Sequence, residues 1–435
     1  MIDWSFIVCG DWAPFDGLDV ALLASPSEFY SDLLPILQDT DLAIVNLEGV
    51  LLDEDLPSII KDGITIRLPT CLTVGLTAVP FQLVCLANNH SLDFGNKGLI
   101  STKKNLDRNG ILSIGAGLSQ DEISNPQIFS FGKTKMAIIN TAEGEEGRFG
   151  NEIPGVAPVE LHFLRSQISS LKTQVDIVTV IVHAGREHLP VPAIYVRDAY
   201  RGLADAGADI IIGHHPHVPQ GIEKYKNSII AYSLGNFVMG INSPIELHRL
   251  GYFIKVYFHG NEMTSFEIWP YQIERDKVRL LQDEKKDHFL KQLDELSDII
   301  INEDSLKSIW LAYMDRWLIS QGIPELLDNI VILGGLSKTL EAILKRILLF
   351  HQSPGLINRL IRSILLRCIL FLENRGFTIN NKSNQIMKAS AILRNRFDTK
   401  AHQELYLVAL KKLMDGDMGK APIWAYQKLD EWKVF

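Results

Sequence analysis

The sequence predicts an α/β fold with a mixed sheet system, followed by an all-helical domain. Over roughly the first 275 residues, short apolar runs of strand type alternate with helical patterns, which is typical of sheets covered by helices. After about Arg275 the strand signals largely stop, and amphipathic helical patterns continue to Phe435. We therefore expect a domain boundary near residue 280, with an α/β domain at 1–280 and a helical domain at 281–435.

The first half of the α/β region predicts five strands and two helices. The strands are expected at Ser5–Cys9, Leu42–Val45, Phe81–Leu86, Ile111–Ile114 and Met136–Asn140. One helix is expected at Pro26–Gln38, with Ser25 as N-cap, Glu28 as its capping-box partner and a kink or stop at Pro35. A second helix is expected at Gly98–Asn109, stopped by Gly110.

The same alternation repeats in the second half. Helices are expected at Pro158–Leu171 and Tyr195–Ala206, and buried strands at Ile177–Val182, Ile210–Ile212 and Ser228–Tyr232. Tyr252–Phe258 and Ser265–Pro270 alternate apolar and polar residues, which indicates antiparallel strands. The sheet system is therefore expected to be mixed.

Composition narrows the class of protein. A net charge of -9 at pH 7 argues against a nucleic-acid partner. The four cysteines are scattered and form no CxxC pair, which indicates reduced thiols. The N-terminus has no basic start and no long apolar segment, and no apolar run approaches the ~20 residues that cross a bilayer. We expect a cytoplasmic protein that is neither secreted nor membrane-spanning.

Polar side chains follow the expected strands at their carboxyl ends. The clearest case is Ala208–His217, where a β-branched run ends at Gly213 and three histidines follow within four residues. If the backbone stays extended there, His215 and His217 project to the same side. The other strand ends carry Asp11, Asn46 and Glu48, Asn89 and His90, and His183.

Together these side chains predict a metal site. Taken alone, an Asp after a strand is usually a turn or cap residue, and a single His is usually structural. However, five strand ends repeat the pattern, and carboxyl ends of strands share one crevice in open α/β sheets. Oxygen and imidazole donors in this mixture suit Mn, Zn, Fe or Mg. We therefore favour a metal site over a solvated turn with several histidines.

These motifs resemble those of the CapA family, the poly-γ-glutamate capsule biosynthesis proteins, which is similar in turn to the calcineurin-like metallophosphoesterases. The matching motifs stand in order: Gly10-Asp11, Asn46-Leu47-Glu48-Gly49, Ala87-Asn88-Asn89-His90 with Asp93 and Gly95, His183 with Gly185 and Glu187, Gly213 to Val218, and Ser233 to Phe237. The resemblance covers roughly the first 275 residues and implies a metallophosphoesterase-like αββα sandwich.

The resemblance also implies one or two divalent metal ions, which would be Mn, Zn or Fe. Glu48 matches the bridging carboxylate, with Asn89, His183 and His215 on one ion and Asp11 and His217 on the other. By the same resemblance, His90 is the acid or transition-state stabiliser beside the leaving group, and Asp93 orients its ring. The alternative for His90 is a buried histidine that caps the strand end.

An anionic or phosphorylated substrate, small molecule or polymer, would meet further side chains near these motifs. The candidates are Asn46, Lys61, Arg67, Arg148, Arg186, Glu187 and Asn236. The basic ones lie in loops next to the motifs, where an ordinary surface charge is the common alternative. Asn236, in Ser-Leu-Gly-Asn-Phe, fits a turn equally well.

The chain departs from the pattern at three places, and one of them is Glu48, since the bridging group is usually an Asp. Metallophosphoesterases usually begin with Asp-x-His, but the first strand here gives Asp11-Trp12-Ala13, so one ligand of the first ion is missing. After His183, Ala184 and Glu187-His188 stand where the CapA pattern usually has Trp and Glu-Tyr. We expect a weakened or absent first ion and a pocket wall that alters substrate preference.

The leading functional hypothesis is a metal-dependent CapA-like enzyme in the making or processing of a cell-surface polymer. By resemblance, the polymer is poly-γ-glutamate or an amino-acid-decorated polysaccharide, and the reaction is phosphoryl or acyl-phosphate hydrolysis or transfer. One alternative is a general phosphoesterase or nucleotidase unrelated to capsule. The other is a non-catalytic scaffold subunit of a membrane synthase, which the missing Asp-x-His ligand favours.

Residues 339–372 form the most unusual part of the helical region. Five basic residues lie among apolar ones there, and Pro354-Gly355 divides the segment into two helices. Such a helix pair can lie on an anionic membrane surface or contact a synthase complex. The commoner arrangement, which we prefer, packs the apolar face against the α/β domain or against a partner, with the arginines outward.

Overall fold

The structure is a computed structural model that describes residues 2–61, 63–143, 155–240, 245–317 and 419–434, with the single residues 320, 405, 408 and 412. The chain divides into two compact units. The first comprises Met1–Ile59, Thr65–Leu306 and Val434, and the second comprises Ile60–Ile64, Lys307–Lys433 and Phe435. Helix α9 (Asp283–Ile301) therefore groups with the α/β region. The domain boundary near residue 280 stays a prediction.

Strand β1 (Trp4–Ala13) lies inside an eight-stranded mixed sheet, and all ten of its residues are buried. The strand order is β18-β17-β16-β1-β2-β5-β6, and β15 pairs with the end of β1. The bounds of the other strands are β2 Leu42–Leu47, β5 Leu83–Cys85, β6 Leu112–Ile114, β15 Asn236–Met239, β16 Leu250–His259, β17 Glu262–Ile273 and β18 Val278–Leu280. β1, β2, β5 and β6 run parallel, whereas β16 runs antiparallel to β1.

The second sheet has six strands in the order β13-β14-β12-β11-β9-β8. Their bounds are β8 Gln127–Phe131, β9 Thr134–Ala142, β11 Ile177–His183, β12 Ile210–His214, β13 Ile222–Tyr225 and β14 Ser228–Ala231. The four central strands are parallel, with hairpin partners β8 and β13 at the two edges. Two small pairs, β3 (Val50–Leu51) with β4 (Arg67–Leu68) and β7 (Ala116–Gly117) with β10 (Gly155–Val156), complete the described strands.

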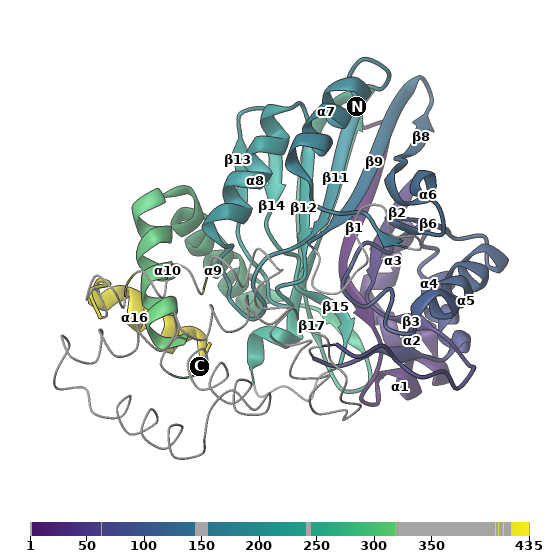
Figure 1. Cartoon of the computed structure of the whole chain (residues 1–435), viewed down its shortest axis with the longest axis horizontal. Coiled ribbons are helices and arrows are strands. Elements are labelled where there is room, and N and C mark those ends of the chain that lie inside the picture. Colours follow the sequence, from purple (N-terminus) through teal and green to yellow (C-terminus); the bar gives the residue numbers. More distant parts are fainter. Residues whose placement is uncertain are drawn as a thin grey trace, which may run out of the picture. The chain divides into compact units, whose positions relative to one another are not determined.

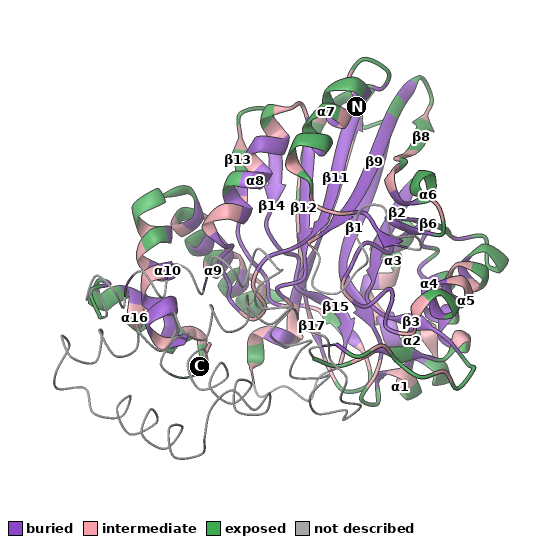
Figure 2. Cartoon of the chain, viewed as in Figure 1, coloured by how far each residue is buried: buried purple, intermediate pink, exposed green. Residues whose placement is uncertain are grey.

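The two sheets pack face to face, with helices on the outside. Alternate residues of both sheets, such as Phe6, Ile44, Ile138 and Ile212, form one shared apolar core. The opposite face of the first sheet is covered by helices such as α5 (Gly95–Arg108), whose Leu99 and Leu106 are buried. Figure 1 shows this arrangement, and Figure 2 shows that the central strands such as β1, β11 and β12 are buried while the helices keep exposed outer faces. The predicted αββα sandwich is confirmed.

The other α-helices of the described residues are short before Ser124 and longer after it. Their bounds are α1 Leu18–Ala24, α2 Pro26–Tyr30, α3 Leu34–Gln38, α4 Thr73–Ala78, α6 Gln120–Ser124, α7 Leu161–Leu171, α8 Ile194–Asp205, α10 Glu303–Trp317 and α16 Ile423–Trp432. The amphipathic patterns of α7 and α8 bury Leu164, Ile168, Val196 and Leu203, as a helix covering a sheet does.

The expected single helix at Pro26–Gln38 is wrong. Ser31 has φ 48°, which interrupts the helix and separates α2 from α3 by a 3₁₀ turn at Ser31–Leu33. Ser25 is the N-cap residue, but its side chain makes no cap hydrogen bond, so the capping box is not formed. Pro35 stands in the first turn of α3, where a missing N–H costs nothing.

Two expectations concern the helical region and its membrane contacts. Among the described residues, no helix combines the length and the apolar composition that a bilayer crossing needs. The predicted basic helix pair at 339–372 lies outside the described residues. Its contact with a membrane surface or a synthase complex stays a prediction.

Candidate metal centre

Asp11 occupies the middle of three neighbouring strand ends. In register it lies opposite Asn46 of β2 on one side and Asn236 of β15 on the other, beside a bulge in β1. Asn46 Nδ2 donates to Asp11 Oδ1 at 2.8 Å, so the amide holds the carboxylate in place. Close strand approach requires Gly10, since a Cβ there would lie 2.0 Å from the Gly235 carbonyl oxygen.

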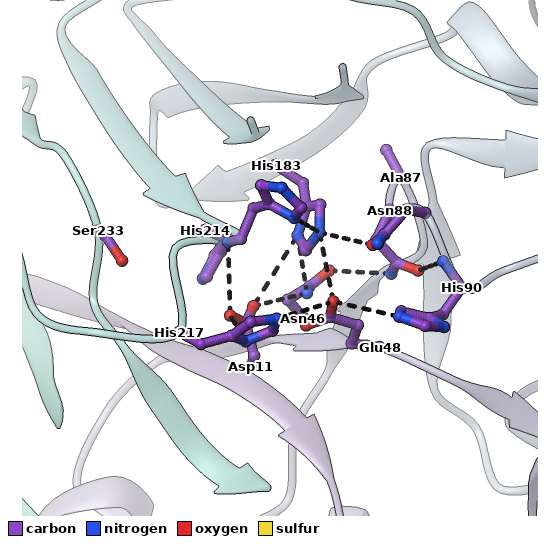
Figure 3. A network of polar contacts seen from close by, with 12 residues as sticks. Asp11, Asn46, Glu48, Ala87, Asn88, His90, His183, His214, His217 and Ser233 are labelled. Carbon is purple, nitrogen blue, oxygen red and sulfur yellow. Dashed lines mark hydrogen bonds and ion pairs between the residues drawn. The ribbon is translucent and has the colours of Figure 1, made fainter. Parts of the chain in front are cut away.

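Glu48 is the first residue beyond β2, and its side chain is fully buried. Neither of its carboxylate oxygens has a hydrogen-bond partner among the described residues. Imidazole nitrogens surround Oε1 instead: His183 Nε2 at 3.4 Å, His217 Nε2 at 3.6 Å and His90 Nε2 at 3.9 Å. Figure 3 shows these side chains converging on the carboxylate. A buried carboxylate without hydrogen bonds is costly unless a cation compensates it.

A second group of donor atoms converges on His183, the last residue of β11. Its Nε2 lies 3.0 Å from Asn89 Oδ1, 3.1 Å from His215 Nδ1 and 3.4 Å from Glu48 Oε1. Ligands about 2.0–2.1 Å from a tetrahedral ion lie roughly 3.3 Å from one another, so this spacing suits a single ion. The four atoms are imidazole nitrogens and oxygens, a donor set that fits a divalent metal.

The backbone around His215 and His217 is not extended, so the condition under which these two side chains were expected to project to the same side is not met. β12 ends at His214, and the φ angles of His215 and His217 are 96° and 58°. Two positive φ values at non-glycine residues are costly and recur at functional sites. The two rings nevertheless lie close together, with centroids 6.1 Å apart, because the chain turns at these residues.

Asn236 fixes the orientation of His217. The Asn236 Nδ2 group donates to the His248 carbonyl at 3.0 Å, which leaves Oδ1 to accept from His217 Nδ1 at 3.0 Å. With Nδ1 held in this hydrogen bond, Nε2 faces Glu48 Oε1 at 3.6 Å. Asp11, Glu48 and His217 form a second group that could hold an ion, beside the group of Glu48, His183 and His215.

Burial and mutual charge separate the pKa values of the site. Burial raises the pKa of Glu48 to about 7. Burial alone would raise the pKa of Asp11, but the surrounding histidines outweigh it and hold that pKa below the usual range. Burial alone would lower the pKa of His217, but the Glu48 and Asp11 carboxylates raise it to about 10. The metal-free site therefore keeps a proton that an ion would have to displace.

His90 and Asp93 lie in the arrangement expected for a ring and its orienting carboxylate. His90 Nδ1 donates to Asp93 Oδ2 at 2.7 Å, and both side chains are buried. The Asn88 amide oxygen accepts the backbone N–H of His90 at 3.0 Å and so fixes the loop after β5. The catalytic role of the pair stays a prediction.

The predicted substrate contacts are spread more widely. Asn46 and Asn236 lie inside the cluster, and Glu187 lies at its edge, where its carboxylate and ring nitrogens of His215 and His217 lie within 4.8 Å of one another. Arg186 lies near His188: burial lowers the pKa of His188 to about 4, and the charge of Arg186 adds to this shift. Arg67 instead pairs with Asp55 at 3.0 Å. Lys61 groups with the second unit, and Arg148 lies outside the described residues.

Three residues of the cluster were not predicted. Asn88 Nδ2 donates to the Leu47 carbonyl and to Asn46 Oδ1, and its place within Asn88-Asn89-His90 was a usable signal. His188 and His248 pack with ring centroids 4.5 Å apart next to His217. Neither histidine directly follows a described strand, so the strand-end pattern could not find them.

Sequence comparison connects these motifs to known proteins. Residues 5–241 match the profile of a family described as bacterial capsule synthesis protein PGA_cap. The PGA biosynthesis protein CapA of Bacillus subtilis (strain 168) is 33% identical over 198 residues, which are 44% of this chain and 51% of that protein. The capsule biosynthesis protein CapA of Bacillus anthracis is 32% identical over 212 residues, 47% of this chain and 52% of that protein. The match thus spans about half the length of these relatives.

Solved structures resemble the chain more distantly. A 5′-nucleotidase precursor from Thermus thermophilus aligns over 67% of this chain and 57% of its own, with 13% identity and a TM-score of 0.37. A putative 5′-nucleotidase from Staphylococcus aureus aligns over 67% of this chain and 58% of its own, with 17% identity and a TM-score of 0.39. Scores this low add nothing to the fold, which rests on the topology described above.

Proposed function

The chain belongs to the bacterial capsule synthesis family PGA_cap, and on that premise we propose that it is a metal-dependent phosphoesterase-type enzyme acting on a cell-surface polymer or its precursor. The relatives' names suggest poly-γ-glutamate, and an amino-acid-decorated polysaccharide is the related possibility. The proposed reaction is phosphoryl or acyl-phosphate hydrolysis or transfer.

One observation carries the proposal: the Glu48 carboxylate is fully buried, has no hydrogen bond among the described residues and is surrounded by imidazoles. A site built only for stability would satisfy those oxygens with N–H or O–H donors. Asn89, His183 and His215 would hold one ion with Glu48, and Asp11 and His217 the other. The chemistry that a divalent ion supplies at such a site is Lewis acidity toward water and phosphoryl oxygens.

The protein's own residues divide the remaining work. Asn46 holds Asp11, and Asn236 holds the His217 ring. Asp93 keeps the Nδ1 proton of His90 in place, so that Nε2, which faces the Glu48 side of the cluster, can carry a proton to a leaving-group oxygen. The carboxylates of Asp11 and Glu48 are fully buried, and removal from water strengthens each charge interaction they make.

Metal content tests the proposal directly. The full-length protein, purified without chelators, would be analysed by mass spectrometry beside Glu48→Ala, His215→Ala and the control His162→Ala, whose ring is exposed on α7. We expect near-stoichiometric Mn, Zn or Fe in the parent and the control, and its loss in the other two. The parent should also hydrolyse a chromogenic phosphodiester or monoester when manganese is added.

The alternative functions give different results. A parent that takes up no metal from excess manganese or zinc contradicts the enzymatic proposal and favours the scaffold subunit, which Ala13 in place of a ligand already suggests. Rapid turnover of simple phosphate esters, with no effect of gene loss on surface polymer, would favour a general phosphoesterase.

A further inference from the structure

We propose, on the basis of the proposed function, that Glu187 is a ligand of the ion held by His217 and replaces the ligand that the first strand lacks. Among the described residues, the side chains that converge at this position are Asp11, Glu48 and His217. The residue two positions after Asp11 is Ala13, which is buried in the apolar core and has no donor atom. Three protein ligands hold an ion less strongly than four, so a fourth donor nearby has a clear use.

Glu187 offers that donor from a different loop. One of its carboxylate oxygens lies within 4.8 Å of ring nitrogens of both His215 and His217. His217 also belongs to the group with Asp11 and Glu48, so the two groups share this ring. The Glu187 side chain is 39% exposed, and its rotatable bonds allow the short movement that coordination requires.

The backbone holds Glu187 next to the histidines. The His188 N–H donates to the Pro216 carbonyl at 2.8 Å, and the Ala184 N–H donates to the His214 carbonyl at 3.1 Å. These two hydrogen bonds tie the loop after β11 to the loop after β12 on both sides of Glu187. The loop is therefore aligned with the ligands His215 and His217 before any ion binds.

Glu143 links the loop after β11 to helix α8. Its Oε2 accepts the Gly185 N–H at 3.2 Å and also the Tyr195 hydroxyl of α8. Gly185 has φ 116°, a conformation that suits glycine and turns the chain toward the cluster.

His188 is placed to orient the carboxylate. Its Nε2 lies 3.5 Å from Glu187 Oε2, and its ring packs on His248 and stands near His217. An imidazole beside a ligating carboxylate limits the directions the carboxylate can take. Glu187 also adds a third carboxylate to the donor set, which increases the attraction for a divalent cation.

The test counts bound manganese rather than activity. Free Mn²⁺ would be titrated into metal-free full-length protein and followed by electron paramagnetic resonance, for the parent, Glu187→Gln and the exposed control Glu284→Gln. We expect two ions in the parent and the control, and in E187Q the loss of one ion or an at least tenfold weaker affinity for it. Glu187→Asp should restore part of the binding, which a merely structural role would not predict.

A second pair of variants identifies the position. His183→Ala should remove the ion shared with Asn89 and keep the one at His217, and in the double variant His183→Ala with Glu187→Gln the remaining ion should be lost or bound at least tenfold more weakly. Unchanged number and affinity of manganese in E187Q overturns this inference alone, whether the parent holds one ion or two. No manganese in the parent overturns the proposed function and this inference together.

Discussion

Asp93 Oδ2 accepts two hydrogen bonds at once, from His90 Nδ1 at 2.7 Å and from the backbone N–H of Ile66 at 2.6 Å. The buried carboxylate therefore joins the His90 loop to the chain before β4, and the tautomer of His90 is fixed. The other nitrogen, Nε2, faces Glu48 at 3.9 Å, which is too far for a hydrogen bond. Nδ1 therefore anchors the ring, and Nε2 is the atom left for proton transfer.

The first prediction follows from that separation. His90→Asn should lower phosphodiester turnover by roughly 10²–10⁴-fold, because general acid catalysis contributes about that much, while metal content stays unchanged. Asp93→Asn should lower turnover less. Steady-state kinetics and metal analysis of the same preparations check this, with the exposed His259→Asn as control. Equal loss of metal and turnover in the His90 variant would mean that His90 is a ligand or a structural residue.

Metal binding should release protons. At pH 8 the metal-free His217, with a pKa near 10, is protonated, whereas Glu48, with a pKa near 7, is mostly ionised. An ion at this position displaces the His217 proton, so about one proton should leave at pH 8 and about two near pH 6, where Glu48 is protonated as well. Affinity should therefore fall as the pH is lowered.

Calorimetric titration with manganese in buffers of different ionisation enthalpy measures the number of protons released. Binding heats that do not depend on the buffer at pH 6 would contradict the raised pKa values of both groups.

Asn236→Ala should weaken metal binding without removing a ligand. The His217 ring loses its Nδ1 hydrogen bond and can rotate, so affinity at this position should fall by about 10–100-fold. The surface variant Asn109→Ala, which also loses a side-chain hydrogen bond, is the matched control. Manganese titration of both variants checks this, and equal affinities would show that packing alone holds the ring.

Gly10→Ala should destabilise the fold strongly. The added Cβ would lie 2.0 Å from the Gly235 carbonyl oxygen and 3.3 Å from the Phe237 backbone nitrogen, and backbone atoms cannot move aside as a flexible side chain can. Overpacking of this kind costs about 3 kcal/mol or more. Gly260→Ala, in a turn with open space but φ 57°, should cost only about 1–2 kcal/mol. Urea denaturation of the metal-free proteins compares the two, and equal losses would contradict the close approach of β1 to β15.

Sequence reasoning reached the parts of the fold that short-range patterns determine. Apolar runs such as Ile177–Val182 and Ile210–Ile212 correspond to β11 and β12, since a buried parallel strand has a continuous apolar sequence. The edge strand β13 and the short strand β15 were missed, because the strand propensity of four residues is a weak signal. The pairing of β15 with β1 also joins distant parts of the chain. The break at Ser31 comes with a positive φ at a non-glycine residue, which no local sequence pattern predicts.

The site was predictable for a different reason. Asp11, Glu48 and His183 lie at carboxyl ends of strands that topology gathers, so their convergence follows from the fold. The convergence of His215 and His217 was foreseen, but for the wrong backbone conformation. Asn236 begins the short strand β15 and His248 lies in a 3₁₀ turn at Glu246–Arg249, and only tertiary structure brings the two residues together.

The position of β1 between β2 and β16 has a consequence for the folding of the chain during its own translation. One edge of β1 pairs with residues 42–47. Its other edge pairs with residues 236–239 and 250–259, which are translated much later. During translation, an all-buried strand made first therefore stays half unpaired until β16, which ends at His259, has left the ribosome. A chain shortened at residue 241, where the family match ends, would keep every candidate ligand but leave that strand as an open apolar edge. Such a fragment should aggregate rather than fold.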